Sequence, residues 1–548
     1  MKRAEIRALK RCKDPELMQA AALTLMRRSM QFGHKKLLYK RAYAAAELGA
    51  ITLDMAKKLT SCNGDSDAKF KIKQEEMFTM TTTTDTSRRS RQAPALLIES
   101  LKTRFGSACS TGESVCNQHG RDESPYPTMA PDAVVFAQST QDVVDAINLC
   151  AAHKVPVIPY GAGSSIEGHV LAIHGGITID VSKMNKVLAL DVDDLTCTVQ
   201  AGVTRMQLNQ EIRSSGLFFP IDPGADASMG GMAATRASGT NAVRYGTMRD
   251  NVVALTVVTA EGKVITTAGR AKKSSAGYDL TRLFVGSEGT LGLIVEVTVR
   301  LYPLPEAVSA AVCTFADVES AVNTVIQSIQ LGVPIARAEM LDGLTVHAIN
   351  RYSKTSLAEQ PMLFLEFHGT PASVKEQAQI VQEVATGNGG ENFEWAINPE
   401  DRTRLWNARH HAFFACLQLK PGSRAFTTDA CVPISKLAEC IAETAQNVKS
   451  SSLPAPIFGH VGDGNFHCVI VADPEIPDEM AEAERLNQSV MQRALRFGGT
   501  CSGEHGVGLH KMGLLFDEHG DDAMELMSRV KVAFDPDNIM NPGKLVSV

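Results

Sequence analysis

The chain has 548 residues, of which 44% are hydrophobic and 21% are charged, and its formal net charge is −6 at pH 7. That length predicts roughly two to four domains, and the small acidic charge argues against nucleic acid as a partner. The sequence has no apolar run near the roughly 20 residues of a transmembrane helix, and its twelve cysteines form no CxxC pair. We therefore expect reduced thiols in an intracellular compartment rather than a membrane protein, a zinc finger or a disulfide scaffold.

The first 93 residues differ in composition from the rest of the chain. Residues 1–58 contain fourteen Lys and Arg against five Asp and Glu, and residues 79–91 are rich in Thr, Ser and Arg. A basic leader of this kind is typical of a mitochondrial transit peptide, although the acidic residues near its start count against that reading. A disordered tail, or a start at a later methionine, explains the composition equally well. We expect a mitochondrial location, with the cytoplasm as the alternative.

From residue 94 onward, short apolar segments alternate with helical patterns and Gly-rich turns. Val252–Thr259 and Val264–Thr267 flank the turn Glu261–Lys263, which predicts a β-hairpin. Near Pro303 the glycine density falls, and a second segment begins there. This mixture predicts an α+β fold rather than a regular βαβ alternation. The other expected elements are strands at Ala133–Phe136, Val155–Ile158, Ile177–Asp180, Cys197–Gln200, Leu293–Val299, Met362–His368 and Ile457–His460, and helices at Gln141–His153, Val318–Leu331 and Pro371–Thr386.

A Gly-rich loop, Pro159–His169, follows the strand expected at Val155–Ile158. Its small residues let backbone N–H groups converge on an anion such as a pyrophosphate. The loop is not the GxGxxG fingerprint of a Rossmann domain, because Ile166 occupies the position of the third glycine. Taken alone, the loop is explained more simply as a strand-to-loop turn.

Two further glycine-rich stretches follow, at Asp222–Val252 and Val285–Gly292. Long irregular loops inside compact domains are usually functional, and the first of these stretches suits a large flat ligand. Three such loops within about 140 residues are hard to explain by turns alone. Together they predict a cofactor-binding domain.

The segment Gly459–His467 reads GHVGDGNFH, and an Asp-Gly pair between apolar runs is a strong signal for a two-residue hairpin turn. With Asp463 and Gly464 as the turn, His460 lies opposite His467, and directly paired positions place their Cβ atoms ~5 Å apart. That spacing suits two imidazoles that bind one metal ion. The alternative is that each histidine is an ordinary core or surface residue.

Two more motifs carry candidate chemistry. Within Gly498–Gly508, Glu504 can supply an anionic metal ligand while its neighbour His505 points toward a substrate. On the helical pattern of Leu405–His411, the two terminal histidines diverge by about 100° and are read as structural rather than chelating. Arg409 precedes them, and its guanidinium fork fits a carboxylate.

The loops PYGAGSSIEGH, RYGTMRDNV and SAGYDLTRLFVGSEGTLG resemble those of the vanillyl-alcohol oxidase / p-cresol methylhydroxylase flavoproteins. Within that family, the chain is most similar to the FAD-linked D-lactate dehydrogenase (cytochrome) or D-2-hydroxyacid dehydrogenase group, over roughly residues 95–546. The resemblance implies a two-subdomain FAD-binding domain of the p-cresol methylhydroxylase type and an α+β cap domain. The expected boundaries are an extension at 1–93, the FAD-binding domain at 94–304, a cap and metal domain at 305–512, and a C-terminal segment at 513–548 that returns to the FAD domain.

The resemblance also assigns roles to residues. It implies a divalent ion, Zn or Mn, on His460, His467 and Glu504, with His505 as the catalytic base and Arg409 and Asn465 near the substrate. The FAD is expected to be non-covalent, because His169 lies beyond the part of the loop where a covalent link usually forms. The cofactor-binding residues implied are Gly161, Ala162, Gly163, Ser164, Ser165, Pro223, Gly231, Ser238, Gly239, Tyr245, Gly246, Glu288, Ile294 and Asn541.

The implied reaction is oxidation of a D-2-hydroxy acid, D-lactate to pyruvate first of all, with electrons passed to cytochrome c or a similar acceptor. D-2-hydroxyglutarate and glycolate are alternative substrates, and a homodimer stays open as the assembly. A flavin transferase of the alkyl-dihydroxyacetone-phosphate synthase type shares the FAD domain but is not expected to carry the histidine hairpin with the Gly-Glu-His-Gly motif. A zinc hydrolase without flavin leaves the three Gly-rich loops unexplained.

Overall fold

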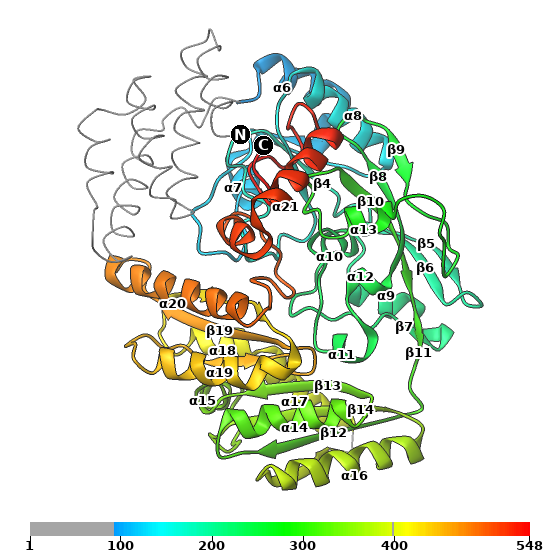
Figure 1. Cartoon of the computed structure of the whole chain (residues 1–548). Coiled ribbons are helices and arrows are strands. Elements are labelled where there is room, and N and C mark those ends of the chain that lie inside the picture. Colours follow the sequence, from blue (N-terminus) through cyan, green and yellow to red (C-terminus); the bar gives the residue numbers. More distant parts are fainter. Residues whose placement is uncertain (1–91, 397–398) are drawn as a thin grey trace. The chain divides into compact units, whose positions relative to one another are not determined.

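A computed structural model describes residues 92–396 and 399–548. They belong to a compact unit, Ser90–Val548, and the predicted basic leader lies outside the described residues. Within the part described, no helix combines the length and the apolar character needed to cross a membrane. The unit is α+β, with three main sheets (Figure 1).

The first sheet lies near the start of the unit and contains a βαβ crossover. Strands β2, β4 and β3 are parallel, and helix α8 (Thr140–Ala152) connects β2 to β3. Ser139 caps α8 by accepting the N–H of Asp142, and helix α6 (Ala95–Phe105) packs beside it. The strands run in the order β1 (Cys109–Ser110), β2 (Ala133–Phe136), β4 (Ile177–Asp180) and β3 (Val157–Tyr160).

The second sheet is antiparallel and forms the other part of residues 92–304, which we call the first half. Its central strand β10 is buried at nearly every position, and α10 (Met229–Thr235) packs against it. The predicted hairpin is confirmed, because β8 pairs with β9 across the expected turn. The order is β5 (Val187–Asp191), β6 (Thr196–Gln200), β10 (Leu293–Arg300), β8 (Val252–Val258) and β9 (Val264–Thr266). Between the first two sheets and the third, a two-stranded ribbon pairs β7 (Leu217–Phe218) with β11 (Tyr302–Pro303).

The third sheet dominates the remaining half, which we call the sheet half (residues 305–511). Its strands pair antiparallel, and those on the main path are β15 (Glu391–Ala396), β12 (Ala307–Thr314), β14 (Met362–Gly369), β13 (Ile335–Leu341), β18 (Ile457–Gly459), β19 (Asn465–Ala472) and β16 (Arg424–Thr427), while β17 (Ala430–Cys431) pairs with β19. All the strands and helices predicted here are present, with ends that differ by a residue or two.

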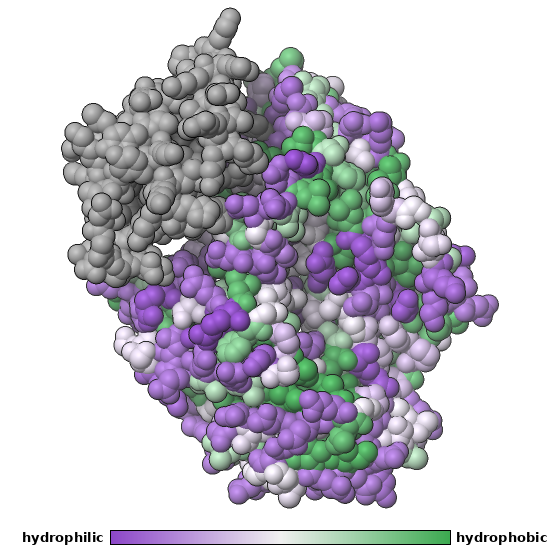
Figure 2. All heavy atoms as spheres, in the orientation of Figure 1, coloured by the Kyte–Doolittle hydropathy of each residue, from purple (hydrophilic) through white to green (hydrophobic). Residues whose placement is uncertain are grey.

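Helices cover both faces of this sheet because its strands are apolar on both sides. Along β14, Leu363 and Leu365 face one cluster, and Met362 and Phe364 face the other. Helices α14 (Val318–Gln330), α16 (Pro371–Gly387), α19 (Ile434–Val448) and α20 (Pro477–Arg496) complete the first cluster. Helices α15 (Gly343–Ser353), α17 (Pro399–His410) and α18 (Ala412–Leu417) complete the second. On the face drawn in Figure 2, the outer side of α20 is largely hydrophilic.

The segment after residue 511 packs on the first half. Helix α21 (Met512–Phe534) carries Lys531 in its last turn, and the buried Nζ of Lys531 donates to the carbonyls of Thr290 and Met540, each at 2.8 Å. Met540 then forms a parallel bridge with Val157 at the edge of the first sheet. In Figure 1 this red segment lies over the blue and cyan elements.

One partly buried helix cap makes the free energy of unfolding of the sheet half depend on pH. Asp342 caps α15 by accepting the N–H and the hydroxyl of Thr345, and burial raises the pKa of its carboxyl to about 6. Because the folded state holds this proton more tightly than the unfolded state, the free energy of unfolding should fall as the pH rises from about 4 to 6.

Replacement of Asp342 by Asn keeps a good cap and removes this titration. We expect urea denaturation of the variant to lose a pH-dependent drop of about 1–3 kcal/mol that the wild type shows between pH 4.5 and 7.5. Asp317→Asn at the exposed cap of α14 is the matched control, and an unchanged pH profile in the Asp342 variant would contradict the assignment.

Candidate active site

A cavity of about 430 Å³ opens between the first half and the sheet half. Its walls on one side are the Gly-rich loops after β3, before α10 and before β10. On the other side they are α17, α18, the β18–β19 hairpin and the segment around residue 504. Each predicted motif except the one at Arg244–Val252 therefore reaches the same space.

The loop after β3 presents backbone N–H groups that are not paired with backbone carbonyls. Among the described residues, none of the N–H groups at 161–166 donates to a backbone carbonyl. A side chain at position 161 would collide with Ser228 Oγ, and Gly163 has φ +67°, in the region that favours glycine. Converging backbone N–H groups without a backbone partner can bind a pyrophosphate anion. Because FAD contains a pyrophosphate, the residues of this loop fit that cofactor.

Most residues that the resemblance implied for FAD line this cavity. They are Gly161, Ala162, Gly163, Ser164, Ser165, Pro223, Gly231, Ser238, Glu288, Ile294 and Asn541. His169 lines it too, with its Nε2 at 3.2 Å from Glu288 Oε2.

Gly239, Tyr245 and Gly246 do not line the cavity. Tyr245 packs edge-on against Phe218 and Tyr302, and its hydroxyl lies 2.8 Å from His368 Nδ1 in the sheet half. The two glycines are required by backbone geometry instead. Gly239 abuts the Asp222 backbone, and Gly246 ends α11 (Ala242–Tyr245) with φ +76°.

The histidine hairpin exists, but its predicted register is wrong by two residues. Phe458 pairs with His467, so His460 lies opposite Asn465 and the loop has four residues instead of two. A two-residue type I′ turn needs φ > 0 at both central positions. Here Gly464 has φ +89°, whereas Asp463 is absent from the residues with positive φ. The two histidines are therefore diagonal neighbours on one face, with ring centroids 5.4 Å apart.

Glu504 joins these two histidines. Its Oε1 lies 3.0 Å from His460 Nε2 and 3.1 Å from His467 Nε2, and the ligand atoms of all three lie within 4.8 Å of one another. Burial disfavours the Glu504 anion, but the two histidines hold its pKa well below the usual range. Two imidazole nitrogens and one carboxylate oxygen form a donor set that fits Zn²⁺ or Mn²⁺ and leaves a position open for substrate.

The other ring nitrogens of the histidines are held by the protein. His460 Nδ1 lies 2.7 Å from Glu339 Oε1, and His467 Nδ1 lies 3.0 Å from the Thr428 carbonyl. Such outer contacts fix the tautomer and turn Nε2 toward the ion. Glu339 is fully buried in β13, and burial opposes its charge, yet His460 and Arg409 keep its pKa low.

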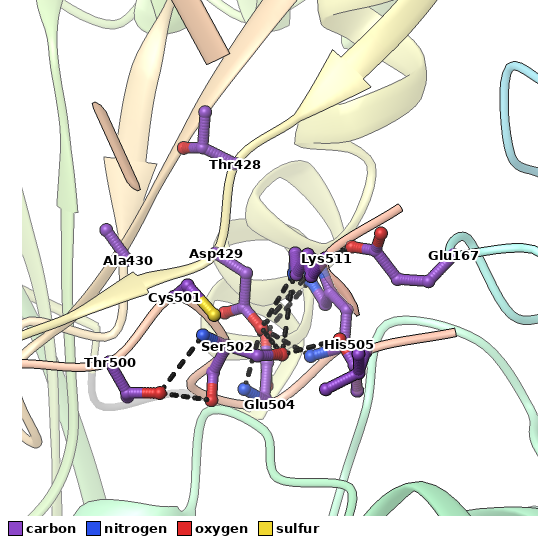
Figure 3. A network of polar contacts seen from close by, with 12 residues as sticks. Glu167, Thr428, Asp429, Ala430, Thr500, Cys501, Ser502, Glu504, His505 and Lys511 are labelled. Atoms are coloured by element: carbon purple, nitrogen blue, oxygen red, sulfur yellow. Dashed lines mark hydrogen bonds and ion pairs between the residues drawn. The ribbon is translucent and has the colours of Figure 1, made fainter. Parts of the chain in front are cut away.

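His505 lies directly beside this set. Its ring stacks on that of His467 at 5.0 Å, and its Nε2 is 3.8 Å from Glu504 Oε1. Its buried Nδ1 has no hydrogen-bond partner, and the nearest carboxylates are Glu167 at 3.8 Å and Asp429 at 3.9 Å. Burial lowers the pKa of this imidazole. Figure 3 shows His505 and Glu504 on one short loop below Asp429.

Arg409 and Asn465 occupy different positions. Arg409 lines the cavity from α17, donates to Glu339 Oε2 at 2.9 Å and stacks over Phe458. Asn465 does not line it; its Nδ2 donates to Asp429 Oδ1 and to the Ala430 carbonyl. Asn465 therefore lies against Asp429 and Ala430 and not at the cavity wall.

Several residues of the site were not singled out from the sequence. Asp429 and Lys511 lie in stretches without a motif, while Glu339 is an acid inside the apolar strand β13, which is a usable signal of a buried partner. His410 lines the cavity, and burial lowers its pKa to about 4. Its neighbour His411 does not line the cavity, so the two adjacent histidines do not share an ion site.

Comparison with known proteins gives two family matches. Residues 131–268 match the FAD binding domain, and residues 304–545 match the C-terminal domain of FAD linked oxidases. The chain is 50% identical to a protein of Danio rerio named probable D-lactate dehydrogenase, mitochondrial, over 80% of this chain and 89% of that one. It is 46% identical to the mitochondrial D-lactate dehydrogenase [cytochrome] of Arabidopsis thaliana, over 83% and 81% of the two chains. The fold matches p-cresol methylhydroxylase with substrate bound at a TM-score of 0.68 and 18% identity, covering 82% of this chain and 96% of that one.

Proposed function

Because the chain belongs to the FAD-linked oxidase family, in the D-lactate dehydrogenase (cytochrome) group, and is an FAD-dependent oxidoreductase, we propose that it oxidises D-lactate to pyruvate with the help of a divalent ion. The observation that carries the proposal is the shared cavity. The Gly-rich loops suited to FAD and the group of His460, His467 and Glu504 line the same cavity.

When bound between these walls, FAD would supply the hydride acceptor for the substrate Cα, and a divalent ion would supply the positive charge that polarises the substrate hydroxyl. His460, His467 and Glu504 would hold that ion, and the protein contacts behind both imidazoles keep their Nε2 atoms aimed at it. The cavity walls bring the acid and the flavin together.

His505 is the proposed base for the hydroxyl proton. Its Nε2 is on the side of Glu504, where the substrate hydroxyl would lie, and takes the proton there. Its Nδ1 is faced by the carboxylates of Glu167 and Asp429, which stabilise the imidazolium that results. The ring is kept in place by stacking on His467.

Arg409 is the proposed partner of the substrate carboxylate. Its contacts with Glu339 use Nε and Nη2. They fix the guanidinium at the cavity wall, so the remaining donors can face an anion without further loss of side-chain freedom.

The electron acceptor and location follow the names of the relatives. Cytochrome c or a similar acceptor would reoxidise the flavin, and the mitochondrion is the proposed compartment. Both the acceptor and the compartment are proposed from the names of the relatives alone.

The proposal is tested by anaerobic titration of the purified flavoprotein with D-lactate, L-lactate, D-2-hydroxyglutarate and glycolate. We expect D-lactate to bleach the flavin absorbance within seconds, with L-lactate at least about tenfold slower. If only another acid of the panel reduces the flavin, that acid and not D-lactate is the substrate. Bleaching by no member would reject the dehydrogenase reaction.

A further inference from the structure

Two buried carboxylates, one from each half of the unit, hold the segment 504–508, which carries the proposed metal ligand and base. Asp429, between β16 and β17, accepts the N–H of Glu504 at 2.9 Å and also that of His505. Glu288, in the loop before β10, accepts the N–H of Val507 at 2.7 Å and that of Gly508 at 2.9 Å. Four of the five backbone donors in this segment are thus fixed by two anions.

Glu288 is built into the wall of the FAD cavity. It has φ +53°, which is uncommon for a residue with a side chain and persists only where the surroundings enforce it. Here its N–H donates to the Ala234 carbonyl at 2.9 Å, and its carbonyl accepts from Asn541 Nδ2 at 2.8 Å. Both partners line the cavity, so the backbone of Glu288 follows the cofactor wall while its carboxylate holds the 504–508 segment.

Asp429 holds the same segment from the other side. It is fully buried and also accepts from Asn465 Nδ2 and from Ser502 Oγ at 3.1 Å. Lys511 lies between the halves, with Nζ 2.7 Å from Glu167 Oε1 and 3.7 Å from Asp429 Oδ2 (Figure 3). The oxygens of both carboxylates therefore already accept hydrogen bonds from backbone N–H groups or face side chains of the protein, and neither carboxylate is free for a ligand.

We propose that Glu288 and Asp429 are positioning residues that couple the two ligand sites, so that FAD and the divalent ion bind cooperatively. When FAD orders the loop that contains Glu288, the position of the Glu288 carboxylate becomes fixed. This carboxylate holds the N–H groups of residues 507 and 508, and through the short segment between them the position of Glu504 is fixed as well. Because coupling is reciprocal, removal of the ion must weaken FAD binding by the same factor. This inference rests on the proposed function, since it requires both ligands.

The test measures release of FAD from the diluted holoprotein, by recovery of free-flavin fluorescence, with Mn²⁺ or Zn²⁺ present or with the ions chelated. For the wild type we expect the FAD dissociation constant to rise about tenfold on chelation. In Glu288→Gln, an amide NH₂ replaces one of the two acceptor oxygens, and the ratio should fall below about twofold. The matched control is Glu296→Gln on β10, whose carboxylate accepts from Thr256 Oγ1 and which should keep the tenfold ratio.

A second variant, Asp429→Asn, guards against direct damage to the FAD pocket. Asp429 does not line the cavity, so its substitution removes no part of the FAD pocket wall and acts through the 504–508 segment and its neighbours Asn465 and Ser502. It should also reduce the ratio below about twofold. A tenfold ratio that survives in both variants, or a wild-type ratio near one, overturns the coupling.

A separate titration of the chelator-treated wild type with a metal-sensitive dye distinguishes the two failures. No binding of Mn²⁺ or Zn²⁺ would reject the metal part of the proposed function together with this inference. Binding of the ion with no effect on FAD release would reject this inference alone.

Discussion

Alanine in place of His505 is expected to slow flavin reduction by D-lactate about 1,000-fold while the protein keeps its FAD. The imidazole is stacked on His467 and faces the cavity with Nε2, so its removal leaves no base at the substrate hydroxyl. Among the described residues, the contacts of its side chain are with Glu167, Asp429, His467 and Glu504 and not with the Gly-rich loop at 161–166, so FAD should stay bound. Stopped-flow reduction under anaerobic conditions, with flavin absorbance per chain as the second readout, measures both quantities.

The control for that experiment is His347→Ala. This histidine is half-exposed on α15 and pairs with Glu359 outside the cavity. It should reduce at the wild-type rate. A His505 variant that retains FAD and reduces within about tenfold of the wild type would eliminate this residue as the base.

The second large effect is expected for Glu504→Gln. The carboxylate is the only anion in the group with His460 and His467, and an amide oxygen is a much weaker ligand for Zn²⁺ or Mn²⁺. We expect the affinity for the ion to fall at least about 100-fold and turnover to fall with it. Metal content by mass spectrometry after dialysis, and turnover with added ion, are the measurements.

His411→Ala is the matched control, because His411 lies near α17 outside the cavity and was read from the sequence as structural. It should retain about one ion per chain. Equal metal content in the Glu504 variant and the control would show that the ion, if any, is bound elsewhere.

The fold could be predicted largely because burial patterns are local. The runs at β2, β4 and β8 are short, apolar and bounded by turn residues, and each became a strand. The family resemblance then located the cavity, since its Gly-rich loops line it as implied. Hairpin register was less certain, because the Asp-Gly pair specifies a turn only if both residues reach positive φ, and the backbone at Asp463 does not.

The remaining residues could not be found from spacing. Glu288 was assigned to the cofactor, but its carboxylate is used by residues about 220 positions downstream. Asp429 carries no motif, and its importance comes from contacts with Asn465, Ser502 and the 504–508 segment that exist only in three dimensions. Tyr245 lies in the Arg-Tyr-Gly sequence that the resemblance assigns to the cofactor. Its hydroxyl instead contacts His368 in the sheet half, and its side chain does not line the cavity.

The packing of residues 540 and 541 against the first half of the unit has a consequence for biosynthesis. Asn541 donates to the carbonyls of His169 and Glu288, and Met540 bridges Val157, more than 370 residues earlier. At about 5–20 residues per second, a ribosome needs roughly 20–80 s to make the intervening chain. During that interval the nascent Gly-rich loop lacks these two neighbours, so this part of the cavity wall is completed only after residues 540 and 541 have been made.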